Sequence, residues 1–433
     1  MSMALDMRSA DFDERFAALV AAKRESSADV DLTVADIIED VRQRGEASLA
    51  ELSLRFDRVE IGRLGLRIDA AAIEAAIGAC EKKALDALKL AHARVMDFHL
   101  RQKPADVSFT DPLGVELGWR WRPIHSVGLY VPGGAASYPS SVIMNAVPAK
   151  VAGCRRIAMV MPTPDGQTNP LTLAAARMAG VDEIYRVGGA QAIAALAYGA
   201  GPISPVDKIV GPGNAYVAAA KRRVFGVVGI DMIAGPSEVV VLADGGADPR
   251  FVAADLLAQA EHDEAAQSIL ITSDAGLARA VEAEVERQLE SLPRATIAGA
   301  SWRLNGAVVL CPSLDAAIPL VDRLAPEHLE IMADDAEALS DKISNAGAIF
   351  LGSHTPEAIG DYIGGSNHVL PTARSARFSS GLGVLDFMKR TSLLKCDARS
   401  LDALGPAAIA LGEAEGLQAH ARSVALRLRV NSP

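Results

Sequence analysis

The chain has few of the residues that mark several common classes of protein. Only four of its 433 residues are cysteines, and none of them forms a CxxC pair. Zinc ribbons and disulfide frameworks need closely spaced cysteines, so the sequence indicates neither. The spacing instead favours a reducing compartment, and we expect a cytoplasmic protein.

Aromatic residues and basic charge are also scarce. Aromatic residues make up 4% of the chain, and the formal net charge is -11. Proteins that bind nucleic acid need a basic surface and often stacking aromatic side chains. No segment offers the roughly 18 uncharged apolar residues of a membrane span, and the charged first 16 residues do not resemble a signal peptide. We therefore predict neither a nucleic-acid nor a membrane partner.

Half of the chain is hydrophobic, which is enough for a large core in two or three domains. From about residue 11 to 103 apolar residues recur at helical spacing. After about residue 108 short β-rich runs alternate with alanine-rich helical stretches, a pattern typical of parallel α/β sheets. The expected strands of this half are 126–131, 156–161, 183–187, 207–210 and 227–232.

A second alternating set follows, with expected strands at 268–272, 307–311 and 348–351. We therefore predict an α/β protein with two α/β domains and helical N- and C-terminal regions. The expected divisions are a helical region at 1–125 that packs with the second α/β domain, a first α/β domain at 126–236, a second at 237–380, and a helical dimerisation segment at 381–433.

Three glycine-containing loops follow expected strands of the first α/β domain. They are Tyr130–Gly134, Val187–Gln191 and Val210–Asn214. Ligands of open parallel sheets bind at the carboxyl ends of strands, and glycine lets them approach the backbone. A tight turn explains each loop equally well. The G-x-G-x-x-G and G-x-x-x-x-G-K-[ST] motifs are absent, so a nucleotide would bind in an unusual way.

Gln259 and His262 are three residues apart on an expected helix, so their side chains share one face and are candidates to bind one metal ion. Histidine is a common zinc ligand, but glutamine is an uncommon one. Further candidates are Asp361, which also suits a turn or an N-cap, and His420. Mixed nitrogen and oxygen ligands suit zinc, with manganese or cobalt as substitutes.

Glu327 and His328 place two titratable groups side by side after Pro326, a residue that suits a first helical turn or the end of a loop. A histidine can accept the proton of an alcohol, and a desolvated glutamate can accept a proton from water. Adjacent side chains on a helix diverge, so both serve one site only if the backbone is irregular. We assign no function to the other histidines, although His368 lies near a polar cluster.

Several of these segments resemble the signature of the histidinol dehydrogenase family. The match is longest over 230–239 and 255–262, and it continues in the family's order through the segments 130–134, 188–191, 211–214, 326–328, 381–387 and 415–420. The resemblance covers nearly the whole chain.

The resemblance implies a set of site residues, each at a position that matches the family's motifs. It implies one zinc ion per subunit on Gln259, His262, Asp361 and His420, with Glu327 and His328 as the proton-transfer residues. The implied substrate contacts are Ser237, Gln259, His262, His328, Asp361, Glu415 and His420. The implied NAD contacts are Tyr130, Gln191 and Asn214. The implied architecture is two Rossmann-like domains of the aldehyde dehydrogenase type in a swapped homodimer with shared active sites.

The implied reaction is the four-electron oxidation of L-histidinol to L-histidine by two NAD, at the end of histidine biosynthesis. His328 would take the alcohol proton, and Glu327 would activate the water that hydrates a bound L-histidinaldehyde. Three alternatives remain open: a related dehydrogenase for another small alcohol, a zinc hydrolase in which Glu327 activates water, and a metal-binding protein without activity. The carboxylate of Glu415 favours a cationic substrate.

Overall fold

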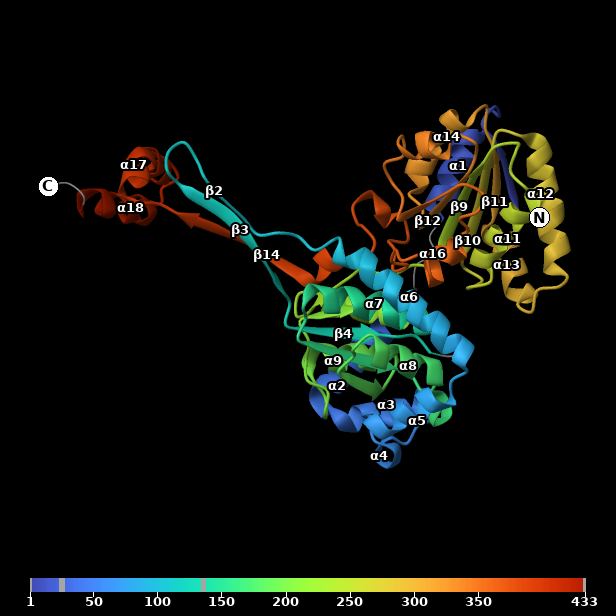
Figure 1. Cartoon of the computed structure of the whole chain (residues 1–433), viewed down its shortest axis with the longest axis horizontal. Coiled ribbons are helices and arrows are strands. Elements are labelled where there is room, and N and C mark those ends of the chain that lie inside the picture. Colours follow the sequence, from blue (N-terminus) through green and yellow to red (C-terminus); the bar gives the residue numbers. More distant parts are fainter. Residues whose placement is uncertain (1, 23–27, 134–137, 431–433) are drawn as a thin grey trace. The chain divides into compact units, whose positions relative to one another are not determined.

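The computed structural model describes residues 2–22, 28–133 and 138–430 (Figure 1). Gly134, the last residue of the first expected glycine loop, lies outside the described residues. The chain divides into two compact units. Unit 1 consists of residues 1–102 and 125–386, and unit 2 consists of residues 103–124 and 387–433.

Unit 1 contains a five-stranded parallel sheet in the order β6-β5-β4-β7-β8. Its strands are β4 (Ser126–Tyr130), β5 (Arg156–Met161), β6 (Glu183–Arg186), β7 (Lys208–Val210) and β8 (Gly229–Ile230). The connecting helices are α7 (Pro139–Ala152), α8 (Pro170–Met178), α9 (Gly189–Tyr198) and α10 (Ala215–Val224). The expected strands of the first α/β domain are thus confirmed, because both faces of this sheet are buried and its strands are continuous apolar runs.

Five N-terminal helices pack on the helices of this sheet. They are α2 (Ala28–Arg44), α3 (Glu46–Asp57), α4 (Ile61–Leu64), α5 (Ala70–Ala79) and α6 (Lys82–Leu100). α2 contacts α9 and α10, α5 contacts α8, and α6 contacts α7 and α8. The expectation that region 1–125 packs with the second α/β domain is therefore wrong for α2 to α5, because α2, α3 and α4 join the core of the first domain and α5 contacts α8. α6 also reaches the expected second domain, where Arg94 donates to the backbone oxygens of Ile363 and Gly364.

The second sheet of unit 1 has six parallel strands in the order β1-β11-β10-β9-β12-β13. They are β1 (Met3–Asp6), β9 (Glu238–Ala243), β10 (Gln267–Thr272), β11 (Ala307–Leu310), β12 (His328–Met332) and β13 (Ala348–Leu351). β1 and the following helix α1 (Phe12–Ala21) also belong to this domain, since Leu5, Phe12 and Phe16 are part of its core.

Helices cover both faces of the six-stranded sheet. They are α11 (Pro249–Ala260), α12 (Ala275–Leu289), α13 (Ala295–Asn305), α14 (Leu314–Leu324), α15 (Ala336–Ser340) and α16 (Glu357–Tyr362). Residues of α1 and α14 fill the core on one face, and residues of α11, α12 and α13 fill the core on the other. Short 3-10 helices occur at Pro164–Gly166, Ser375–Arg377 and Val384–Phe387.

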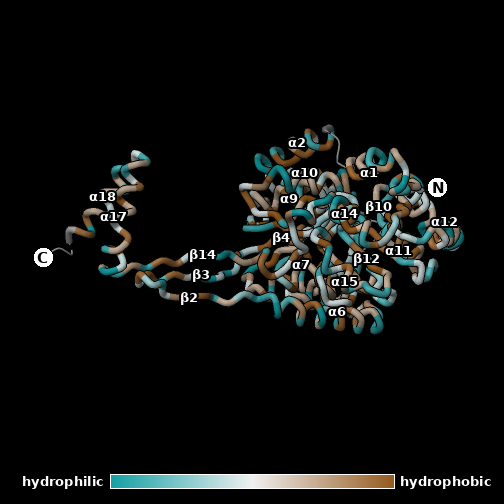
Figure 2. Tube along the Cα trace, turned by 90° about the horizontal axis from the view of Figure 1, so that it is seen from above, coloured by the Kyte–Doolittle hydropathy of each residue, from teal (hydrophilic) through white to brown (hydrophobic). Residues whose placement is uncertain are grey.

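Unit 2 is an antiparallel three-stranded sheet followed by a helical hairpin. Its elements are β2 (Val107–Thr110), β3 (Glu116–Pro123), β14 (Met388–Lys395), α17 (Ala398–Ala414) and α18 (Gln418–Val430). The expected helical segment 381–433 is therefore wrong in two respects: residues 381–386 belong to unit 1, and the segment contains a strand. Figure 2 shows hydrophobic and hydrophilic residues interspersed along these strands and helices.

The strands of unit 2 were not assigned from the sequence. Apolar and polar residues alternate along β2 and over 119–122 of β3, whereas β14 shows no alternation and most of its side chains are exposed. β14 pairs with β3 over eight residues, from Met388 opposite Pro123 to Lys395 opposite Glu116. None of the helices within the described residues is long and apolar enough to cross a membrane.

Candidate active site

The polar cluster of unit 1 lies at the amino ends of two neighbouring strands of the six-stranded sheet, β9 and β12. Glu238 is the first residue of β9, and His328 is the first residue of β12. The two strands are parallel, with His328 opposite Val239. The usual ligand position in such sheets is the carboxyl edge, so this cluster occupies the opposite edge.

Alternation along β12 sends its polar side chains to one face. Leu329 and Ile331 enter the core that includes α14, whereas Met332 packs with the residues of α11. Because successive side chains of a strand point to opposite faces, His328 and Glu330 point to the α11 side. Both are almost fully buried. The segment after Pro326 is therefore a strand and not a helical turn.

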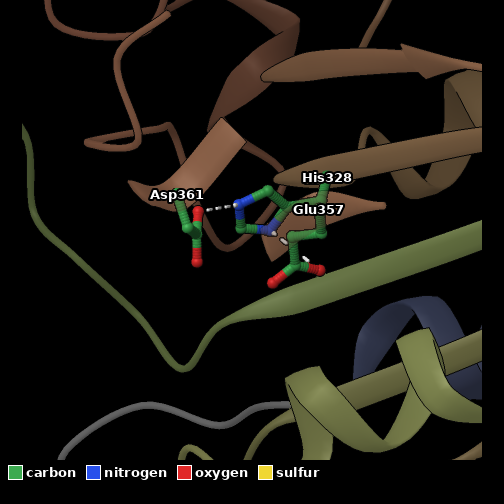
Figure 3. Close-up of side chains that lie close together, drawn as sticks. All are labelled: His328, Glu357 and Asp361. Carbon is green, nitrogen blue, oxygen red and sulfur yellow. Dashed lines mark ion pairs between the residues drawn. The ribbon is translucent and has the colours of Figure 1, made fainter. Parts of the chain in front are cut away.

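His328 lies between two carboxylates of the short helix α16 (Figure 3). Its Nε2 is 3.7 Å from Oδ1 of Asp361, and its Nδ1 is 3.9 Å from Oε2 of Glu357. Glu357 and Asp361 are four residues apart, so they share one face of the helix. The ligand atoms of all three residues lie within 4.8 Å of one another, which is close enough to hold a metal ion.

The Nδ1 proton of His328 is directed away from the carboxylates. Nδ1 donates to the backbone oxygen of Glu238 at 3.1 Å. A donor at Nδ1 makes Nε2 the nitrogen that exchanges protons in the neutral ring. Nε2 is buried, and it forms no hydrogen bond with any of the described residues. The geometry therefore leaves one ring nitrogen available for proton transfer.

Gln259 joins this cluster from the C-terminal end of α11. It is fully buried, and its side-chain nitrogen, in the orientation that satisfies its surroundings, donates to Oε1 of Glu357 at 3.0 Å. The same nitrogen is 3.2 Å from Nδ1 of His328. In this orientation the amide oxygen of Gln259, the atom that could bind a metal ion, is on the side of the amide group away from Glu357.

Glu327 also reaches the cluster, although it precedes His328 directly. Its Oε2 accepts a hydrogen bond from the backbone nitrogen of Glu238 at 3.0 Å and lies 3.8 Å from Nδ1 of His328. Glu327 lies just before the first residue of β12, so the alternation of the strand does not force the two side chains apart. The backbone bends at Glu327, so both side chains can face one site, as the sequence analysis required.

Burial and neighbouring charge shift the acidity of these groups. Burial raises the pKa of Glu327 to about 7, against the opposing effect of His328. Burial also raises the pKa of Glu357. Burial lowers the pKa of His328, but Glu357, Glu327 and Asp361 outweigh that effect and raise it well above its usual value. Burial opposes ionisation of Asp361 as well, yet the nearby ring of His328 lowers its pKa.

A second pair of carboxyl groups lies behind the cluster. Glu330 accepts a hydrogen bond from the backbone nitrogen of Glu357 through Oε1 at 2.6 Å. Its Oε2 is buried and faces the carboxyl group of Asp255 on α11. Burial and this neighbour raise the pKa of Glu330, and burial raises the pKa of Asp255. The pair is thus stable with a shared proton, because two buried carboxylates would repel each other.

The remaining expected residues of this half lie in or beside the same region. The Nδ1 atom of His262 donates to the backbone oxygen of Ala258 at 3.0 Å, so the proton of the neutral ring lies on Nδ1. The charge of His262 acts on Asp361, although His262 is outside the compact group of His328, Glu357 and Asp361. Ser237 is partly buried in the loop that enters β9, and its backbone oxygen accepts from Gln267.

The three expected NAD contacts lie at the carboxyl edge of the five-stranded sheet. Tyr130 ends β4, and its buried hydroxyl group accepts from the backbone nitrogen of Gly189 at 3.2 Å. Gln191 is buried in the first turn of α9. Asn214 is the N-cap of α10, and its Oδ1 accepts from the backbone nitrogens of Tyr216 and Val217. Each glycine loop is therefore also a strand-to-helix turn.

Glu415 and His420 belong to unit 2, and both are exposed there. Glu415 caps the end of α17, and His420 lies in the first turn of α18. The expected ligand set of Gln259, His262, Asp361 and His420 thus draws on both units.

Sequence reasoning missed Glu357 and His368. Glu357 stands four residues before Asp361, a helical spacing that could have revealed it. His368 is partly buried, and its Nδ1 donates to the backbone oxygen of Asp361 at 2.9 Å, while Nε2 is 3.3 Å from Oγ of Ser141. Burial lowers the pKa of His368. No spacing in the sequence connects Ser141 with His368.

A buried histidine among carboxylates at one parallel sheet, with glycine loops at the edge of another, defines the chain as an α/β enzyme. The sequence model of the family "Histidinol dehydrogenase" matches residues 20–428. The histidinol dehydrogenase of Bradyrhizobium diazoefficiens is 65% identical over 431 residues, which is 100% of both chains. That of Rhodopseudomonas palustris is 64% identical over 428 residues and 99% of each chain.

A solved structure agrees with these sequence matches. The crystal structure of histidinol dehydrogenase from Elizabethkingia anophelis matches with a TM-score of 0.95 at 36% identity, over 100% of this chain and 99% of that chain. The chain belongs to the histidinol dehydrogenase family.

Proposed function

We propose that this chain oxidises L-histidinol to L-histidine through bound L-histidinaldehyde and uses two NAD as co-substrates. The observation that carries the proposal is the buried imidazole of His328, which has one ring nitrogen engaged by a backbone oxygen and the other turned to Asp361. A histidine held in this way can accept a proton at a defined position. Membership of the histidinol dehydrogenase family supports the choice of substrate.

The donor set suits a zinc ion held by Gln259, His262, Asp361 and His420. Asp361 supplies a carboxylate with a lowered pKa, and His262 has its Nδ1 proton bonded to a backbone oxygen. Both features favour metal binding, because ligands must be deprotonated and correctly oriented. When bound, zinc would supply positive charge that fixes the imidazole and amine of the substrate.

His328 would take the hydroxyl proton of histidinol while the hydride of the same carbon passes to the first NAD. The amine of histidinol would bind zinc as the neutral amine, because an ammonium group has no lone pair to donate. Neighbouring carboxylates raise the pKa of His328, and the positive charge of a zinc ion held by Asp361 would oppose that effect. The products of this step are the aldehyde, NADH and one proton.

Glu327 would remove a proton from the water that adds to the aldehyde. Its pKa of about 7 suits a general base near neutral pH. The hydride of the hydrated aldehyde then passes to a second NAD, and the carbon becomes a carboxylate. The oxygen added to the product comes from that water. Because each of the two oxidations transfers one hydride, each histidinol yields two NADH. Glu357 positions Gln259 through the hydrogen bond between their side chains.

NAD would bind at the carboxyl edge of the five-stranded sheet, against Tyr130, Gln191 and Asn214. The N-terminus of α10 follows the glycine loop there, and its backbone donors suit a pyrophosphate. The glycine residues of the loops allow the close approach that such contacts require.

A homodimer would supply Glu415 and His420 to the site of a second subunit. Unit 2 carries many exposed large apolar side chains, namely Val107, Phe109, Leu393, Leu394, Leu411, Leu417 and Leu426. Exposed apolar surface of this extent is typical of an interface. A mixture of His328→Asn and His420→Ala chains, refolded together, should recover part of the activity that each variant lacks alone. No recovery would contradict the shared site.

The function is tested by following NADH absorbance with L-histidinol before and after chelation. We expect NADH with the metal present, no NADH after the metal is removed, and recovery when zinc is restored. Absence of NADH from the metal-loaded chain would contradict the proposal and favour a hydrolase.

A further inference from the structure

An ion pair between Lys221 and Asp231 is buried in the five-stranded half of unit 1. Lys221 lies on α10, and Asp231 directly follows β8. Their side chains are 2% and 1% exposed. Neither residue belongs to the expected catalytic, metal or NAD contacts, although Asp231 stands in the segment that most resembles the family signature.

A pair buried to this degree is costly to form. Removing two charges from water costs several kcal/mol per ion after relaxation, and hydrophobic residues of similar size often stabilise a fold equally well. A contribution to the stability of the fold is therefore a weak explanation for this pair. Its contacts offer a better one.

Both charged groups hold the backbone of Gly211. The backbone nitrogen of Gly211 donates to Oδ2 of Asp231 at 2.8 Å, and Nζ of Lys221 donates to the backbone oxygen of Gly211 at 3.0 Å. The backbone nitrogen of Met232 donates to Oδ1 of Asp231 at 2.6 Å. The ion pair thus fixes the donor and the acceptor of one residue at once.

Gly211 needs such support because its backbone conformation is unusual. Its φ of +111° is one that other residues rarely adopt, and a Cβ atom there would collide with the backbone oxygen of Tyr130. The hydroxyl group of Tyr130 in turn accepts from the backbone of Gly189. The ends of β4, β6 and β7 are therefore linked through Gly211, Tyr130 and Gly189.

We propose that Lys221 and Asp231 are positioning residues for NAD, which hold Gly211 so that the loop 211–214 presents its backbone to the nucleotide. The inference rests on the proposed nucleotide site. The two side chains do not touch NAD. They remove the freedom of the loop before NAD arrives, so that less conformational entropy is lost on binding.

The test compares two double variants by titration of NADH fluorescence. Lys221→Met with Asp231→Asn removes both charges together and leaves no unpaired buried ion. Arg223→Met with Asp31→Asn is the matched control, because this more exposed pair joins α10 to α2 and neither side chain bonds to the loop 211–214. We expect the first variant to raise the Kd of NADH and the KM of NAD by about tenfold or more, a size typical of small misplacements in binding sites.

The KM of histidinol and the zinc content should stay unchanged in both variants, and the control should bind NADH as the wild type does. Unchanged NADH binding in the folded Lys221→Met, Asp231→Asn variant would overturn the inference. If that variant does not fold, Asp231→Glu tests the same point. It keeps both charges, but its side chain is one methylene group longer, so the carboxylate that holds Gly211 must shift. Wild-type affinity in Asp231→Glu would equally overturn the inference. Failure of the wild type itself to bind NADH would overturn the proposed nucleotide site instead.

Discussion

The two sheets of unit 1 use opposite edges and opposite chemistry. The six-stranded sheet gathers His328, Glu327 and the carboxylates of α16 at its amino edge, where burial shifts their acidity. The five-stranded sheet offers glycine loops at its carboxyl edge, where hydrogen bonds to backbone groups dominate. Proton transfer needs titratable groups in a dry environment, whereas binding of a nucleotide needs accessible backbone. Under the proposed function, the six-stranded sheet would carry the chemistry and the five-stranded sheet would bind NAD.

The largest effect is expected from His328→Asn, which removes the proton acceptor and keeps a polar side chain of similar size. We expect kcat to fall by about 10²- to 10⁴-fold, the usual range for a general base. The Kd of NADH should not change, because the loops of the other sheet are untouched. His354→Asn is the control, since His354 is an exposed histidine after β13. A parallel loss of NADH affinity in His328→Asn would break the comparison.

Gly211→Ala should produce the next largest effect, on binding and not on chemistry. The added Cβ meets the backbone oxygen of Tyr130, so the loop must shift. We expect the KM of NAD to rise by about 10- to 100-fold, with zinc content and the KM of histidinol unchanged. Gly226→Ala is a matched control, because Gly226 also has a positive φ but nothing within 4 Å of an added Cβ. Equal effects of the two variants would mean that backbone strain alone is responsible.

Glu330→Gln should make the fold less sensitive to alkaline pH. The pKa of Glu330 is raised in the fold by burial and Asp255, so the folded chain holds a proton that the unfolded chain releases. Stability from this group is present at acidic pH and is lost as pH rises above the ordinary carboxyl range through the folded pKa. Glutamine cannot lose a proton and can still donate to Asp255.

The variant should therefore gain about 1 to 3 kcal/mol over the wild type at mildly alkaline pH and less at acidic pH. Thermal unfolding midpoints at several pH values measure this difference. A difference that does not change with pH would show that Glu330 is ionised in the fold.

The smallest effect is expected from Tyr130→Phe. It removes one hydrogen bond, from the backbone of Gly189, and keeps the ring in the core. A neutral hydrogen bond contributes about 1 kcal/mol, so we expect the KM of NAD to rise only a few-fold. Tyr216→Phe on the exposed side of α10 should have no effect. A change in kcat at saturating NAD would contradict a role limited to the loop.

The sequence predicted the two sheets unequally. The five strands of the first domain were predicted because buried apolar runs alternate with helices. β12 was missed because Pro326 suggested a helical turn, although Leu329 and Ile331 alternate with the polar residues. β9 was left unassigned, and β1 is only four residues long. In unit 2, β2 and part of β3 alternate in polarity but were not assigned, and β14 has no alternation to detect.

The sequence predicted candidate site residues but not how they are arranged. The short spacings of Gln259 with His262 and of Glu327 with His328 suggested candidates. The approach of His328 to Asp361 depends on the packing of α16 against the sheet. Gly360 of α16 lies so close to the ring of Phe350 that a Cβ atom there would collide with it. Contacts of this kind join residues far apart in the chain, and local spacing does not encode them.

The most direct test of the account is the yield of NADH from a limiting amount of L-histidinol in the presence of an aldehyde trap. The account predicts two NADH per histidinol, with L-histidine as the product and no trapped aldehyde, because one site carries out both oxidations. A yield of one NADH per histidinol, or accumulation of the trapped aldehyde, would contradict it.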